Sequence, residues 1–240
     1  MVFGRYMGCK ELTWLITPER MLDIQGAAVA ILPIRAEQRH TGLIYKTDDE
    51  LRMLHLAWHH RVRDEEASSV HSVPLKLNII QSGLVATACG IVAARFGRLG
   101  AEQLPYGLRH CASAFVGEGK LNIAGRTSGL TCATFVLAVL DYAGIELLDI
   151  ATWPERLEDV QWQEQIIALL ELGSPRAEPE HVAAVRADMP CARVRPEEVA
   201  AAASRWPPVA MWDMDLERQA TGLVECLNEV FETVSASSGG

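Results

Sequence analysis

The sequence lacks features that mark several common functional classes. Its six cysteines form no C-x-x-C pair, so their spacing fits neither a zinc site nor a small disulfide framework, and a reducing compartment is the simpler expectation. Basic residues are fewer than acidic ones, and the formal net charge is -9. Because phosphate binding needs a basic surface, we expect no nucleic-acid partner. The sequence indicates no metal and no other cofactor.

Long apolar runs are missing as well. The amino-terminal residues contain no basic segment followed by an apolar core, so they do not resemble a secretory signal peptide. No uninterrupted apolar stretch has the length of a membrane span, and the longest ones, residues 83–96 and 132–145, are expected to be buried helices. We therefore predict a protein without a membrane span that is cytoplasmic, or exported by a route that needs no cleavable signal.

The chain does contain enough apolar material for a substantial core, because 49% of its residues are hydrophobic. The periodicity of these residues predicts an α+β fold with two regions, 1–150 and 151–240. The first region combines an antiparallel sheet with two helices: strands at 26–34, 40–46 and 51–60, and helices at 82–96 and 131–143. The second is a helical extension packed on or capping the first, with helices at 154–172, 179–187, 196–204 and 215–234.

Cys132 is the candidate nucleophile. It lies where a glycine-containing loop, residues 128–131, runs into the predicted helix. A thiol in the first helical turn lies near the positive end of the helix dipole, and free N–H groups there can help to bind an oxyanion. Cys132 also shares a helical stripe with Phe135 and Val139, so burial as an ordinary core residue is the alternative.

The histidines supply a candidate base. If the hairpin between strands 40–46 and 51–60 centres on residues 48 and 49, the numbers of paired residues sum to 48 + 49 = 97. His40 and His55 are then diagonal neighbours on one sheet face, roughly 7–8 Å apart. His55 could orient His40, as a third group orients the base of a nucleophilic triad. His59 is the other diagonal neighbour of His40, so the third residue is either His55 or His59.

Together these segments resemble the NlpC-like hydrolases, which have a papain fold. In that family a cysteine opens a helix in a phrase such as D-C-S-G-F-V, and a histidine opens a strand as H-V-G-I-Y. The matching phrases here are Thr131-Cys-Ala-Thr-Phe-Val and His40-Thr-Gly-Leu-Ile-Tyr. The histidine precedes the cysteine by 132 − 40 = 92 residues, which is similar to the circularly permuted branch that includes lecithin-retinol-acyltransferase-like proteins. The resemblance implies a papain-like sheet packed against the nucleophile helix, and a triad of Cys132, His40 and His55.

Other residues extend or limit the resemblance. Pro105-Tyr-Gly-Leu is similar to a P-Y-x-L phrase of the permuted branch, which implies that the Tyr106 hydroxyl helps to hold the oxyanion. The chain departs from the family at Thr131, where the family has Asp or Asn, and at Ala133, where it has Ser. These changes leave open how the active-site loop is held. The resemblance covers residues 26–145, and residues 146–240 could form a lid, a partner surface or a specificity subdomain.

These residues predict a cysteine hydrolase that cleaves an amide bond in a peptide, a peptidoglycan stem or an isopeptide through a thioester. A cell-wall substrate would require export, and a secretion-system effector would meet that requirement. Two other functions stay open. The same thioester could pass its acyl group to an amine or a lipid, which predicts an apolar acyl channel. A catalytically inactive papain-like scaffold could instead bind a partner, through tryptophans such as Trp58, Trp206 and Trp212 or through the carboxy-terminal helices.

Overall fold

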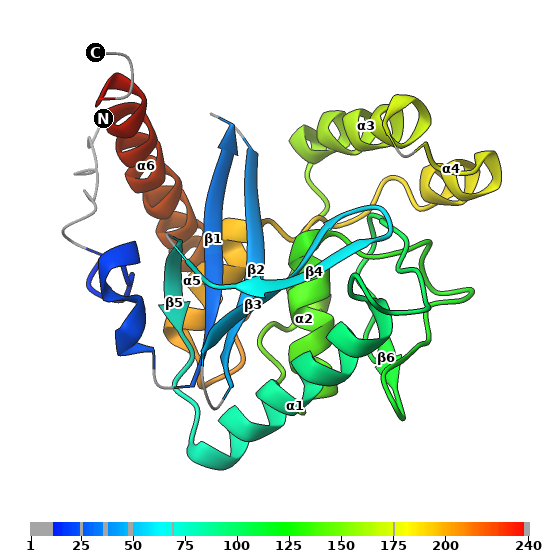
Figure 1. Cartoon of the computed structure of the whole chain (residues 1–240). Helices are drawn as coiled ribbons and strands as arrows, with labels where there is room; N and C mark the ends of the chain where they lie inside the picture. The colour runs from blue at the N-terminus through cyan, green and yellow to red at the C-terminus, as the bar shows by residue number, and fades with distance from the viewer. Residues whose placement is uncertain are drawn as a thin grey trace, which may run out of the picture.

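The computed structural model describes residues 12–24, 26–35, 38–47, 50–68, 70–174 and 176–237. Within these residues the fold is α+β, with an antiparallel sheet and six α-helices, as the sequence predicts, but the sheet has five strands where the sequence predicts three (Figure 1). The sheet has the order β4-β3-β2-β1-β5. Its strands are β1 (Ala27–Arg35), β2 (Gln38–Lys46), β3 (Leu51–Trp58), β4 (Arg61–Glu66) and β5 (His71–Pro74).

The register of the central hairpin confirms the predicted one. In the antiparallel ladder of β2 and β3, Leu43 lies opposite Leu54 and Ile44 opposite Met53, so the paired numbers sum to 97. The predicted turn at residues 48–49 lies outside the described residues. The return strand is shorter than the predicted 51–60, because the chain turns at residues 59–60, where His60 has a φ of 58°.

The sequence prediction misses β4. This strand reads Arg-Val-Arg-Asp-Glu-Glu, and Val62 is its one buried side chain. It is an edge strand, and charged side chains at a sheet edge keep other chains from pairing with it. The sequence of β4 therefore lacks the alternation of apolar and polar residues that predicts a strand, and it resembles that of a solvent-exposed loop.

The helices begin at residues that cap them. α1 (Ile79–Phe96) starts three residues before the predicted helix, because Asn78 and Gln81 form a reciprocal capping box. α2 (Cys132–Tyr142) begins directly after its cap, Thr131. The remaining helices are α3 (Leu157–Leu172), α4 (Pro179–Ala187), α5 (Pro196–Arg205) and α6 (Met214–Ser237). Two-residue strands, β6 (Phe115–Val116) and β7 (Lys120–Leu121), interrupt the loop between α1 and α2.

The helices α1, α2 and α5 share one hydrophobic core with one face of the sheet, and the opposite face packs on the amino-terminal segment that contains Met21 and Ile24. α2 packs on β2 and β3 and contacts α1, which confirms the expected sheet against the helix of Cys132. α5 packs on β1 and β5 and contacts α6, while α3 and α4 contact each other, away from the sheet. One hydrophobic cluster includes Leu54 of β3, Phe135 of α2 and Ala201 of α5. The helical extension therefore shares the core of the sheet.

Two expectations need correction. The stretch 83–96 is buried on one face alone: Val85, Cys89 and Val92 are buried, whereas Leu84 and the preceding Ile80 are exposed. By length and composition alone, α1 also qualifies as a helix that could cross a membrane.

Among the described cysteines four are free, namely Cys89, Cys111, Cys132 and Cys191. Cys226 is disulfide-bonded, which departs from the expectation of reduced thiols.

Candidate active site

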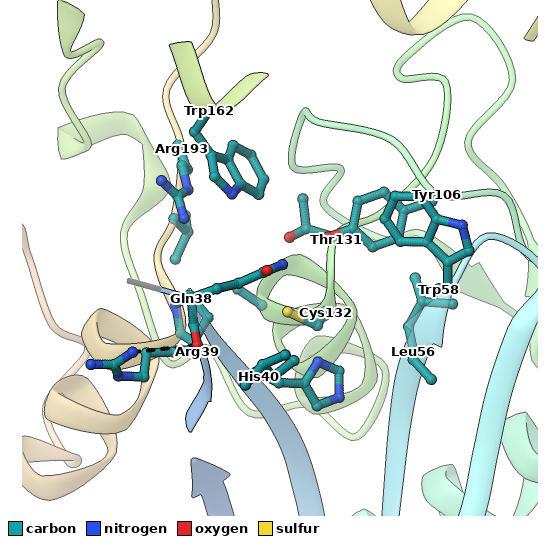
Figure 2. A pocket seen from close by; sticks show the side chains of 15 residues that line it. Gln38, Arg39, His40, Leu56, Trp58, Tyr106, Thr131, Cys132, Trp162 and Arg193 are labelled. Atoms are coloured by element: carbon teal, nitrogen blue, oxygen red, sulfur yellow. Dashed lines mark hydrogen bonds between the residues drawn. The ribbon is translucent and has the colours of Figure 1, made fainter. Parts of the chain in front are cut away.

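Cys132 is the first residue of α2, and its sulfur faces a small cavity (Figure 2). Thr131 fixes the helix start: its hydroxyl accepts a hydrogen bond from the N–H of Thr134 (3.0 Å), and its own N–H donates to the Thr134 hydroxyl (2.8 Å). This reciprocal cap explains how the loop is held without the Asp or Asn of the family phrase. Cys132 is 8% exposed, so both the core alternative and a buried nucleophile fit its burial.

His40 lines the same cavity as Cys132, from the neighbouring strand β2. The cavity measures about 50 Å³. Figure 2 shows the imidazole of His40 beside the start of α2, below the Cys132 sulfur, with Tyr106 and Trp58 on one side and Trp162 and Arg193 on another. The structure thus brings together the two residues that the sequence pairs over a separation of 132 − 40 = 92 positions.

His55 contacts His40 directly. The Nε2 atom of His40 lies 2.7 Å from Nδ1 of His55, and both side chains are buried. Nε2 of His55 in turn lies 3.1 Å from Oε1 of Glu65 on β4. Gly42 makes room for this arrangement, because a Cβ at that position would lie 3.0 Å from the Cβ of His55. A chain of three polar side chains therefore crosses β2, β3 and β4 and ends in the cavity.

The carboxylate of Glu65 determines which nitrogens carry protons in this chain. A carboxylate only accepts hydrogen bonds, so Nε2–H of His55 donates to Glu65 and Nδ1 of His55 is left as an acceptor. Nε2–H of His40 then donates to that Nδ1. The unprotonated nitrogen of His40 is therefore Nδ1, and this nitrogen is able to accept a proton.

Burial governs the protonation of the site. It lowers the pKa of His40 to about 3, with further lowering by His55 and Arg63, so His40 is neutral near pH 7. Burial likewise lowers the pKa of His55, against the opposing effect of Glu65. Burial raises the pKa of the Cys132 thiol, while the backbone of Thr41 and the charge of Arg193 act in the opposite direction. The resting pair is thus a neutral thiol and a neutral imidazole.

Tyr106 also lines the cavity, and two glycines place it there. The segment around Tyr106 forms a parallel bridge with Leu130, in which Leu130 N–H donates to the carbonyl of Pro105 (3.1 Å). A Cβ at Gly129 would lie 2.4 Å from that same oxygen, and a Cβ at Gly107 would lie 2.4 Å from the Gly129 nitrogen. The approach of the two segments therefore requires glycine at both positions.

The Tyr106 hydroxyl keeps its proton. Burial raises its pKa, the charge of a Cys132 thiolate raises it further, and Arg193 and the backbone of Cys132 oppose the shift. These influences indicate that the hydroxyl is near Cys132. A protonated phenol can donate a hydrogen bond to negative charge that develops there.

His59 is not the third residue beside His40. Its Nδ1 accepts a hydrogen bond from the backbone N–H of Tyr106 (3.1 Å), and its ring stacks near His60 and His181. His181 contacts the same peptide segment, with its Nε2 lying 2.9 Å from the Tyr106 carbonyl oxygen. Of the two candidates, His55 is therefore the one that contacts His40, whereas His59 contacts the Tyr106 segment.

Sequence reasoning missed several residues of this site. Glu65 lies on the unpredicted strand β4, and Gln38 precedes the predicted start of β2, with its side chain extending over Cys132 in Figure 2. Arg193 and Trp162 come from the helical extension and stack on each other, the guanidinium carbon lying 3.7 Å from the ring centre. Arg193 is also paired with buried Asp159 (3.0 Å). No local signal links these extension residues to Cys132.

Within the described part of the chain, no group of three or more His, Cys, Asp or Glu side chains could hold a metal ion. Comparisons with family models, curated proteins and solved structures found no match to this chain. The resemblance to the permuted NlpC-like branch therefore stays a prediction that depends on the motifs.

Proposed function

We propose that this chain is a cysteine hydrolase of a permuted papain-like type, which cleaves an amide bond through a thioester on Cys132. The observation that carries the proposal is the contact series Glu65–His55–His40, which ends in the cavity lined by Cys132. A buried core cysteine does not need two buried histidines held in defined tautomers beside it. Burying such polar groups costs stability unless they are paired, so a catalytic role accounts for their presence.

In the first half of the reaction His40 acts as the general base. Its Nδ1 accepts the proton of the Cys132 thiol while the sulfur attacks the carbonyl carbon and the carbonyl π electrons move to oxygen. His55 stabilises the imidazolium that forms, because its Nδ1 accepts from Nε2–H of His40 and Glu65 lies behind it. Collapse of the intermediate breaks the C–N bond, and the leaving amine takes the proton from His40.

In the second half a water molecule replaces the amine. Nδ1 of His40 accepts a proton from this water as its oxygen attacks the thioester. The C–S bond then breaks to release the acid, and His40 returns the proton to the Cys132 sulfur. The oxyanion of both intermediates is held by the free N–H groups at the start of α2 and by the Tyr106 hydroxyl. The side-chain amide of Gln38, which extends over Cys132, is a further donor for this charge (Figure 2).

Hydrolysis is favoured over acyl transfer by the size of the cavity. A cavity of about 50 Å³ has room for a water molecule, but not for a long acyl chain. Its walls include polar groups, among them Gln38, Thr131 and Arg193, which suit a peptide-like substrate. The substrate is accordingly proposed to be a peptide, a peptidoglycan stem or an isopeptide.

The proposal is tested by incubating the purified chain with peptidoglycan sacculi and, separately, with a mixture of defined peptides, and measuring newly released amines. We expect release by the wild type and a loss of at least about a thousandfold in Cys132→Ala. Cys111→Ala is the matched control, since Cys111 is also free and buried. Equal turnover by the two variants would contradict the assignment of Cys132.

A further inference from the structure

α1 is apolar on both of its faces, although only one of them is covered. Its inner face packs into the main core through Val85, Cys89 and Val92. Its outer face lies on the outside of the molecule, along the lower edge in Figure 1. We define this outer face as the exposed residues Ile79, Ile80, Gly83, Leu84, Thr87, Gly90 and Ala94. A helix that is hydrophobic all round normally has apolar surroundings on every side.

The exposed apolar side chains at the helix ends are large. Ile79 is 86% exposed and Ile80 72%, and Leu99, just beyond the carboxy-terminal end of α1, is 98% exposed. The middle of the outer face carries only glycine, threonine and alanine, so it is flat. This face carries no charged side chain at all.

The charges in the stretch of sequence that contains α1 are opposite in sign to the net charge of the chain. From residue 67 to residue 101 the sequence has no Asp or Glu, although the formal net charge of the chain is -9. Three basic residues, Lys76, Arg95 and Arg98, lie in this stretch. Arg95 is paired with Glu102, whereas Lys76 and Arg98 are exposed and form no ion pair with another described residue. An uncompensated positive charge therefore lies at each end of the outer face.

From this arrangement we propose that the outer face of α1, with Lys76 and Arg98, docks the protein on a membrane surface that contains anionic lipid. The helix lies in the plane of the interface, with Ile79, Ile80 and Leu84 inserted among the acyl chains and the two cations at headgroup level. The inner face stays packed on the sheet.

The positive charges of Lys76 and Arg98 favour a membrane over a second copy of the chain as the partner of the outer face. In an antiparallel pair of α1 helices Lys76 would face Arg98 of the other copy, and in a parallel pair each cation would face its own equivalent. Both arrangements bring like charges together in an apolar contact, which is unfavourable. An anionic lipid surface satisfies the apolar residues and the cations at once.

The test is co-sedimentation of the full chain with vesicles of phosphatidylcholine alone or mixed with phosphatidylglycerol. We expect binding to the mixed vesicles, weaker binding to the neutral ones, and a decrease with salt. Ile79→Glu with Ile80→Glu should lower binding about tenfold or more. An acidic residue in the first helical turn favours the helix, so we expect this variant to stay folded. Lys76→Glu with Arg98→Glu should lower binding by at least about fivefold for each residue.

Leu157→Glu is the matched control. Like Ile79 it is the first residue of its helix, and it is 90% exposed, but it lies on α3. It should bind the mixed vesicles as the wild type does. Absence of wild-type binding, or an equal loss in Leu157→Glu, would overturn the proposal. So would a wild-type dimer that dissociates in the Ile79→Glu, Ile80→Glu variant without any vesicle binding, because a second copy would then be the occupant.

Discussion

At the scale of single residues, Glu65 determines the state of the two buried histidines. Its carboxylate lies 3.1 Å from His55, yet its own side chain is 46% exposed. A half-exposed charge is partly screened by water, so its orienting effect is expected to exceed its contribution to stability. The residue is therefore a positioning residue that acts on His40 through His55.

Replacing the carboxylate tests this role. In Glu65→Gln the amide can still accept from His55 but carries no charge, so we expect kcat for amide cleavage to fall by roughly tenfold with little change in KM. The pKa of His55 should fall further, because Glu65 raises it. NMR titration of the histidine ring measures this shift. Glu66→Gln, on the same strand and exposed, should leave both quantities unchanged.

The part of the site that can be predicted from sequence is the part that depends on residues close together in the chain. The hairpin between β2 and β3 has short spacing and a clear apolar pattern, which together determine a register that places His55 near His40. Glu65 could not be found in this way, because β4 carries charged residues and lacks alternation. His59 was an equal candidate on counting, and only the turn at residues 59–60 directs it elsewhere.

At the scale of elements, the approach of two loops to the start of α2 is the feature that places Tyr106. The sequence analysis assigns no helix or strand to residues 101–129. The bridge between Tyr106 and Leu130 joins residues 24 positions apart (130 − 106) without a strand pattern, so spacing could not reveal it. The capped start of α2 was predictable, since Thr131 is a typical N-cap.

A pair of glycine substitutions tests this approach of the loops. Gly129→Ala should destabilise the protein by about 2 kcal/mol or more, because the new Cβ would lie 2.4 Å from the Pro105 oxygen. Gly90→Ala, in α1, meets nothing within 4 Å and should stabilise by about 0.5–1 kcal/mol through helix propensity. Thermal unfolding of both variants measures the difference. A Tm for Gly129→Ala at or above that of the wild type would exclude the steric argument.

At the scale of the whole molecule, the helical extension completes the candidate site. A buried ionic cluster joins the start of α3 to the start of α5: Asp159 pairs with Arg193 (3.0 Å) and Arg195 (2.9 Å), and Arg156 pairs with Glu198. The cluster holds Arg193 at the cavity that Cys132 lines. Such long-range placement follows from packing of the complete chain, and no sequence pattern in residues 151–240 indicated it.

The buried histidines make the stability of the whole molecule depend on pH. Burial lowers the pKa of His40 to about 3 and that of His59 to about 4, and also lowers the pKa values of His55, His60 and His110. The unfolded chain then binds more protons than the native one as pH falls below about 6.5, so stability is lost in that direction. We expect Tm to fall by roughly 10 °C between pH 7 and pH 4.5. A constant or rising Tm over this range would contradict the burial of these rings as neutral groups.

The measurement that tests the central claim most directly is site-resolved labelling of the thiols with chloroacetamide at pH 8, located by mass spectrometry. The account predicts that Cys132 is labelled well ahead of the other described free cysteines, Cys89, Cys111 and Cys191, because Cys132 lines the same cavity as His40, its proposed base. It also predicts that His40→Ala abolishes this preference and that His55→Ala weakens it. Equal labelling of the four thiols, or unchanged labelling of Cys132 in His40→Ala, would contradict the claim that Cys132 and His40 act as nucleophile and base.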